Sequence, residues 1–217
     1  MDLIDRMDEI VSNKGLLSHP FYQAWNEGKL EMDSLKEYAV QYYHFEKSYP
    51  IFLSGLHYRC QDQAVRQHIL ENLWDEEYGP DNHVELWLRF CDALGLERDF
   101  VKYSEQSEAT SQLINTYKHL TAEESLVAGA SALYAYESQV PEVARTKIEG
   151  LKDFYDISDE RAISFFITHE LLDIEHSDAE REMVMALCNN QDDDQAAIQG
   201  TKSASEALWG FLDGIEI

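Results

Sequence analysis

Residues 164–182 read SFFITHELLDIEHSDAERE, and this stretch decides how we interpret the fold. Each residue of an α-helix turns the chain by about 100°, so steps of four and three residues place His169, Asp173 and His176 on one stripe. Two imidazoles and a carboxylate on one stripe are ligands suited to iron, manganese or zinc. The alternative is a core-facing stripe with structural histidines. The intervening apolar residues are expected to bury the stripe against other helices: Leu171, Leu172 and Ile174.

The chain has 217 residues, 44% of them hydrophobic, which is enough for one domain with a substantial core. We therefore expect a single domain over residues 1–217. The 17 basic residues are far outnumbered by 42 acidic ones, which leaves a net charge of -25. Such a charge argues against nucleic acid and against an anionic membrane surface as partners.

The chain has no run of 18 apolar residues and no signal-peptide core near its N-terminus. We therefore expect a cytoplasmic protein without a transmembrane helix. Its three cysteines, Cys60, Cys91 and Cys188, are far apart. Neither a disulfide framework nor a thiolate zinc site is indicated.

Apolar residues recur at helical spacing along most of the chain, and no alternating strand pattern of any length is present. The sequence therefore predicts an all-α bundle. Helices are expected over residues 1–12, 18–28, 32–60, 62–78, 82–94, 105–120, 121–140, 141–151, 158–188 and 199–212.

Two other helical regions carry groups that could join the stripe. Glu76 and His83 are seven residues apart, which is two helical turns, although Gly79-Pro80 lies between them and can rotate one half against the other. Glu137 ends a segment of apolar and small residues and is expected to face inward. An inward carboxylate is costly unless it is paired or bound to a metal. The other members of its stripe are Leu126, Ala130 and Leu133.

Three imidazoles and three carboxylates form the resulting set: Glu76, His83, Glu137, His169, Asp173 and His176. Helical bundles that bind two metal ions project such mixed sets into their cores. The alternative is a buried salt-bridge network, but no Lys or Arg on these stripes would neutralise three carboxylates. We therefore predict a site for two metal ions, with the pair open among Fe/Fe, Mn/Fe and Mn/Mn because the same ligands serve all three.

The first part of the chain carries three short motifs: His19-Pro20-Phe21, Gly28-Lys29-Leu30 and, after Tyr38, Gln41-Tyr42-Tyr43. They resemble the opening of TenA/PqqC-like proteins. The six-ligand set resembles that of the dimetal branch of the same fold, the haem-oxygenase-like diiron oxidases, and above all the CADD-like group, called after a chlamydial protein associating with death domains. The resemblance covers nearly the whole chain and implies a haem-oxygenase-like helical bundle.

The resemblance also implies an activity. CADD-like proteins supply para-aminobenzoate for folate synthesis by cutting the ring from one of their own tyrosines, with O₂, a reduced dimetal centre and therefore an external reductant. By position, Tyr22 would be the sacrificed tyrosine, Lys147 the amino donor and Tyr136 an auxiliary tyrosine. Phe165 stands where a tyrosine is expected in the chlamydial protein. Family members are commonly dimers, so a homodimer is expected.

Several alternatives remain open from the residues themselves. Tyr22 alone would be a packed aromatic, and Lys147 alone would reach solvent. The protein could instead be a diiron oxygenase or oxidase that acts on an external small molecule, or a metal-free TenA- or PqqC-like enzyme. A haem oxygenase would need an axial histidine, and His19 immediately precedes Pro20. The remaining alternative is that the protein is not an enzyme but binds a partner protein through its acidic surface.

Overall fold

The computed structural model describes residues 2–217, apart from the side chain of Ile174. Within that part of the chain there are eleven α-helices, one short 3₁₀ helix and no strand, which confirms the predicted all-α class. The elements are α1 (Leu3–Asn13), η1 (Leu16–Ser18), α2 (Pro20–Asn26), α3 (Met32–Arg59), α4 (Gln63–Glu77), α5 (His83–Ala93), α6 (Arg98–Tyr103), α7 (Glu108–Ala122), α8 (Leu126–Glu137), α9 (Val140–Phe154), α10 (Ser164–Leu187) and α11 (Gln191–Asp213).

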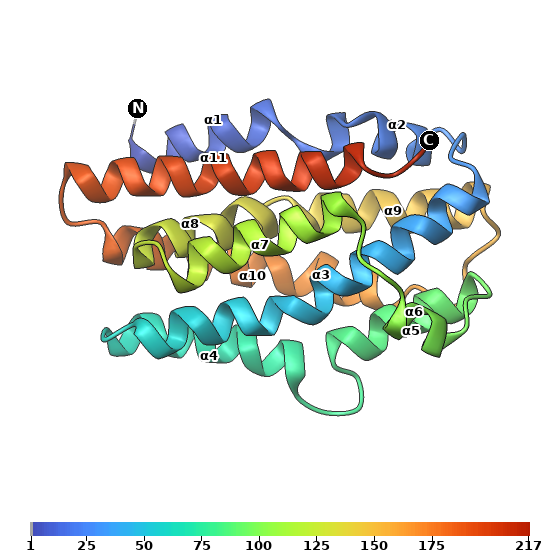
Figure 1. The fold of residues 1–217 in the computed structure, drawn as a ribbon, viewed down its shortest axis with the longest axis horizontal. Helices are drawn as coiled ribbons and strands as arrows, with labels where there is room; N and C mark the ends of the chain where they lie inside the picture. The colour runs from blue at the N-terminus through green and yellow to red at the C-terminus, as the bar shows by residue number, and fades with distance from the viewer. Residues whose placement is uncertain (1) are drawn as a thin grey trace.

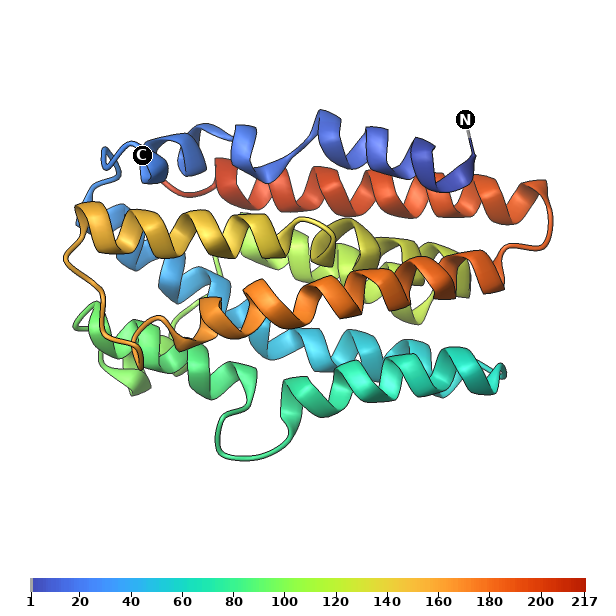
Figure 2. The same ribbon diagram turned by 180° about the vertical axis from the view of Figure 1, so that it is seen from behind.

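The long helices lie roughly along one direction and form an elongated bundle (Figure 1). Helix α11 packs on α8, α7 and α1, and α3 packs on α7 and α4. Seen from behind, α10 runs between α9 on one side and α4 on the other (Figure 2). Helix α10 also packs on α8 and α5, so the helix with the histidine stripe touches every other helix that carries a predicted ligand.

Aromatic side chains of α3 fill the centre of the bundle. Tyr38, Phe45, Tyr49 and Phe52 are all buried, as helical spacing along one face predicts. The C-terminal apolar segment also packs into this chain's own core, because Leu208, Phe211 and Leu212 are buried.

Capping side chains explain where two predicted helix starts were wrong. Helix α7 continues through Thr121, and α8 begins only at Leu126, because the Ser125 side chain accepts the hydrogen bond of the Ala128 N–H. Helix α2 is capped by His19 rather than by Ser18, and it ends before Gly28, whose φ is +65°. A left-handed backbone of this kind favours glycine.

The start of α10 and the start of α11 also differ from the prediction. Helix α10 begins at Ser164, after a turn, rather than near residue 158. Helix α11 begins at Gln191, where Asn190 accepts hydrogen bonds from the Asp192 and Asp193 N–H groups. The acidic segment predicted as a linker is therefore the first turn of a helix, where negative charge is favourable. Helix α6 was not predicted.

Some apolar side chains of α10 and α4 lie at the surface, among them Leu171, which was expected inside. On α10, Leu171 is 66% exposed, because two residues beyond His169 is about 200° around the helix. Leu172 is half-buried, and the Ile174 side chain lies outside the described part of the structure. On α4, Ile69 is buried but Leu70 and Trp74 are about half exposed.

The described helices include none that combines the length and the apolar character needed to cross a bilayer.

Candidate metal centre

All six predicted ligands meet in the middle of the bundle. Helix α4 supplies Glu76, α5 supplies His83, α8 supplies Glu137, and α10 supplies His169, Asp173 and His176. All are buried, and the most exposed of them, His176, is only 9% accessible. They fall into two adjacent groups, in each of which the ligand atoms lie within 4.8 Å of one another.

The first group consists of Glu76, His83, His169 and a residue that was not predicted, Glu46 on α3. Glu76 Oε1 lies 3.0 Å from His83 Nδ1, so the Gly79-Pro80 interruption does not keep the two apart. His169 Nδ1–H donates to the Phe165 carbonyl at 2.8 Å. The His169 Nε2 lone pair is therefore the one available to a metal, since a ring nitrogen that carries a proton cannot coordinate.

The second group consists of Glu137, Asp173 and His176. His176 Nδ1 lies 3.5 Å from Asp173 Oδ1 and 3.8 Å from Glu137 Oε2. Glu137 Oε1 accepts hydrogen bonds from the Tyr49 hydroxyl and from Asn72 Nδ2, the latter at 2.8 Å. These two donors hold the Glu137 carboxylate so that its other oxygen faces His176.

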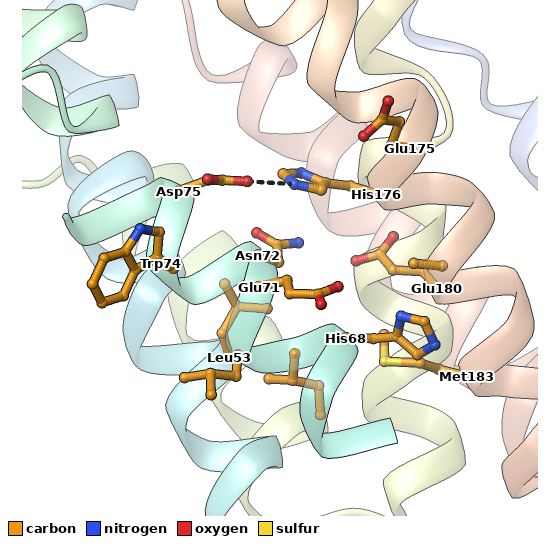
Figure 3. A pocket seen from close by; sticks show the side chains of 13 residues that line it. Leu53, His68, Glu71, Asn72, Trp74, Asp75, Glu175, His176, Glu180 and Met183 are labelled. Carbon is orange, nitrogen blue, oxygen red and sulfur yellow. Dashed lines mark hydrogen bonds and ion pairs between the residues drawn. The ribbon is translucent and has the colours of Figure 1, made fainter. Parts of the chain in front are cut away.

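An open groove of about 480 Å³ runs between α4 and α10 and reaches this second group. Figure 3 shows Asp75 pointing across the groove to His176, and Asn72 and Glu180 facing each other deeper inside. His176 Nε2 lies 3.2 Å from Asp75 Oδ2. The exposed Leu70 and Trp74 of α4 also line the groove.

The donor set fits a metal site, because buried oxygen atoms are left without partners. Glu46 Oε1, Glu76 Oε2, Glu137 Oε2 and Asp173 Oδ2 have no hydrogen-bond partner. A buried, unpaired carboxylate is strongly unfavourable unless a cation neutralises it. Hard or borderline divalent ions with carboxylate and imidazole ligands supply that neutralisation.

The acid–base properties of the side chains show the same excess of negative charge. Burial raises the pKa of Asp173 to about 7, and burial together with the Glu76 carboxylate raises the pKa of Glu46. Burial alone would lower the pKa of His83, but neighbouring Glu76 outweighs it and raises that pKa to about 9. Burial and the adjacent His83 lower the pKa of His169, which favours the neutral, metal-binding imidazole.

Sequence reasoning missed Glu46, although a signal was present. Glu46 follows Tyr38 and Tyr42 by steps of four on α3, so it lies on a stripe of buried aromatics. It is the same type of signal, an acid on an apolar stripe, by which Glu137 was found. Asp75 gave no such signal, because its role depends on a contact with a different helix.

The three residues assigned by resemblance, Tyr22, Lys147 and Tyr136, line one small internal cavity of about 20 Å³ together with His169. The sequence alone suggested that Lys147 would reach solvent, but in the structure it is only 4% exposed. Its Nζ lies 5.2 Å from the centre of the Tyr22 ring. It donates a hydrogen bond to the Tyr38 hydroxyl at 2.6 Å, and that hydroxyl is 3.3 Å from the hydroxyl of Tyr22.

An all-α bundle with two adjoining carboxylate–imidazole groups in its core defines a helical metalloprotein of the haem-oxygenase-like kind. Residues 36–209 match the sequence profile of the family described as iron-containing redox enzymes, and the chain belongs to that family.

The similarity to individual proteins extends over nearly the full chain. A 4-aminobenzoate synthase of Chlamydia pneumoniae is 40% identical, covering 96% of this chain and 92% of its own. A protein of the same name from Nitrosomonas europaea is 37% identical, covering 97% and 89%. A crystal structure from Shewanella denitrificans, described as having a haem oxygenase-like fold, superposes with a TM-score of 0.85 at 19% identity, covering 99% and 92%.

Proposed function

We propose that this protein makes para-aminobenzoate from its own Tyr22 side chain, in an O₂-dependent reaction at a dimetal centre held by Glu76, His83, Glu137, His169, Asp173 and His176. Lys147 supplies the amino nitrogen. The similarity to proteins named 4-aminobenzoate synthase supports the product. The observation that carries the proposal is the shared cavity of Tyr22, Lys147, Tyr136 and His169.

The geometry around Tyr22 matches the bonds that must change. In para-aminobenzoate the amino group occupies the ring position opposite the carboxyl carbon, where tyrosine carries its hydroxyl. The Tyr38 hydroxyl bridges the two groups, because it accepts a hydrogen bond from Lys147 Nζ and lies 3.3 Å from the Tyr22 hydroxyl. At the opposite end of the ring, the Cα–Cβ bond of Tyr22 must break, and O₂ is the oxidant of the Cβ that becomes the carboxyl carbon. At the hydroxyl end, the ring C–O bond breaks and its oxygen leaves as water. The Lys147 Cε–Nζ bond breaks by hydrolysis after O₂-dependent oxidation of Cε, which leaves an aldehyde on the lysine side chain.

Burial prepares the Lys147 amine for its role. Loss of hydration lowers the pKa of Lys147 to about 7, although the Glu46 carboxylate partly opposes this shift. About half of the amine is then neutral at neutral pH, and only the neutral amine has the lone pair needed to attack a carbon.

Tyr136 connects the ligand region with Tyr22. Its hydroxyl is hydrogen-bonded to that of Tyr42, and the Tyr42 ring centre lies 5.5 Å from that of Tyr38. On its other side, the Tyr136 ring centre lies 5.3 Å from that of Tyr49, which donates to Glu137. Phe165 has no hydroxyl, so it contributes packing against His169 rather than a proton or a radical site.

These residues would hold a metal pair, Fe/Fe or Mn/Fe, which together with O₂ and an external reductant would supply the oxidising power that carbon–carbon cleavage requires. The protein side chains hold the ring, the amine and their protons in a cavity with room for about one water-sized molecule. Such a small space limits competing reactions with solvent.

The intact mass of the protein tests the proposal most directly. The reduced, iron- and manganese-loaded protein would be exposed to O₂ and analysed by mass spectrometry, with peptide mapping across Tyr22 and Lys147. We expect loss of the Tyr22 side chain together with free para-aminobenzoate. Tyr22→Phe should give no product while it retains its metal, and undiminished product would disprove the assignment of Tyr22.

A second function is favoured by the groove beside His176. Its volume of about 480 Å³ is within the usual range of roughly 300–1,000 Å³ for small-molecule sites. A diiron oxygenase that acts on an external small molecule could use this groove. Consumption of O₂ by a chain that remains intact through several turnovers would support this second function against the first.

A further inference from the structure

We infer that Glu46 is a ligand of the metal bound by Glu76, His83 and His169. This seventh ligand lies beyond the six-residue set of the proposed function, although the inference rests on the metal centre proposed there. The metal in the first group would then have two imidazole and two carboxylate side chains, and the metal in the second group one imidazole and two carboxylates.

Glu46 lies close enough to the first group to share an ion with it. One Glu46 carboxylate oxygen lies within 4.8 Å of a ligand atom of each of Glu76, His83 and His169. Atoms that share one metal ion necessarily lie a few ångströms apart, because each is bonded to the same centre at about 2.0–2.2 Å. Glu46 satisfies this distance condition, and so do Glu76, His83 and His169, which the sequence predicted as ligands.

No hydrogen bond accounts for the burial of Glu46 Oε1. Its side chain is 2% exposed, and Oε1 has no hydrogen-bond partner. Residues on the same stripe of α3, such as Tyr38 and Tyr42, do have hydroxyl partners. A buried carboxylate oxygen without a hydrogen-bond partner is costly to the fold, and a cation in the first group removes that cost.

With Glu46 as a ligand, the two groups should differ in their affinity for metal. Four side-chain ligands hold an ion more tightly than three of the same type. The first group should therefore fill before the second, and the protein should bind its two ions in two steps. Glu46→Gln keeps the shape of the side chain but removes the anionic oxygen, so it should weaken the first step.

The experiment is an isothermal calorimetric titration of metal-free protein with Mn²⁺ or Fe²⁺ under anaerobic conditions, which measures the affinity of each binding step. We expect two binding steps for the wild-type protein. In Glu46→Gln the affinity of the tighter step should fall by at least about tenfold, because loss of a hydrogen-bond partner of a ligand already costs that much. Circular dichroism would verify that the variant retains its helices. A crystal structure of the metal-loaded protein should show a Glu46 oxygen bonded to the ion.

Glu180→Gln is the matched control. Glu180 is also a fully buried glutamate, but it belongs to neither ligand group, and its carboxyl faces Glu137 of the second group rather than the first group. It should leave the tighter step unchanged. The inference is wrong if Glu46→Gln retains wild-type affinities, or if both variants weaken the tighter step equally, which would indicate a general charge effect. If the wild-type protein binds no metal, the proposed centre itself is wrong.

Discussion

Asp75 and His176 lie 101 residues apart in the sequence, yet Asp75 Oδ2 is 3.2 Å from His176 Nε2 across the groove between α4 and α10 (Figure 3). A carboxylate only accepts hydrogen bonds, so Nε2 must carry the proton. With Nε2 protonated, Nδ1, which faces Asp173 and Glu137, is the nitrogen available to a metal. Asp75 thus sets both the tautomer and the orientation of a proposed metal ligand.

Asp75→Ala should weaken metal binding at the second group. Without the acceptor, His176 can rotate and can protonate either nitrogen, so we expect affinity to fall by about ten- to a hundredfold. Calorimetric titration with Mn²⁺ measures the change. Glu71→Ala is the control, because Glu71 lines the same groove without contacting His176 in the described structure; an equal loss in both variants would contradict the role given to Asp75.

Product formation should depend on pH through Lys147. Burial lowers the pKa of Lys147 to about 7, so the reactive neutral amine is the minor form below that pH and the major form above it. If the amine limits the reaction, the single-turnover rate should rise about tenfold between pH 6 and pH 8. Stopped reactions with quantified para-aminobenzoate measure this rise, and a flat profile over that range would contradict a Lys147-limited step.

Lys147 should also make folding stability depend on pH. The folded-state pKa is about 7 and the model-peptide value is 10.5, so between these values the unfolded chain binds more protons. Burial of Lys147 therefore lowers the free energy of unfolding most at low pH. The free energy of unfolding rises with pH between about 7 and 10.5, by roughly 1 kcal/mol per pH unit. Lys147→Met should lack this rise. Urea unfolding of metal-free protein at pH 6.5, 7.5 and 8.5 compares the two slopes.

Metal removal should destabilise the fold. The oxygens of Glu46, Glu76, Glu137 and Asp173 that lack hydrogen-bond partners would be neutralised by bound cations. Binding to the folded state alone adds about 2.7 kcal/mol per site when free metal exceeds the dissociation constant a hundredfold. The thermal midpoint should rise with Mn²⁺ concentration and return to the metal-free value with a chelator. A midpoint independent of Mn²⁺ would mean that these side chains hold no ion.

Two glycines of α11 should respond in opposite directions to alanine. A Cβ at Gly200 would lie 2.4 Å from the Ala128 carbonyl oxygen, where α11 crosses α8, whereas at Gly210 it would meet nothing within 4 Å. We expect Gly200→Ala to cost about 1–3 kcal/mol through overpacking. Gly210→Ala should add about 0.5–1 kcal/mol, because glycine is a poor helix former at an exposed position. Chemical denaturation of both variants tests the pair.

Helical periodicity was readable because it depends on neighbours a few residues apart. The stripe of His169, Asp173 and His176 and the inward direction of Glu137 follow from a turn of 100° per residue, whatever the rest of the chain does. Helix starts do not follow from periodicity. Ser125 and Asn190 cap helices at positions where several other polar residues were available, and tertiary packing decides among such candidates.

By itself, therefore, the sequence determined the all-α class and the residue types that could hold two metal ions, because both are properties of local helix geometry. Only the tertiary structure decided which side chains meet. Glu46 joins Glu76 and the histidines, and Lys147 lies against Tyr22, through contacts between helices far apart in the chain. The physical reason is that periodicity specifies which face of a helix turns inward, whereas packing between helices specifies what that face finds there.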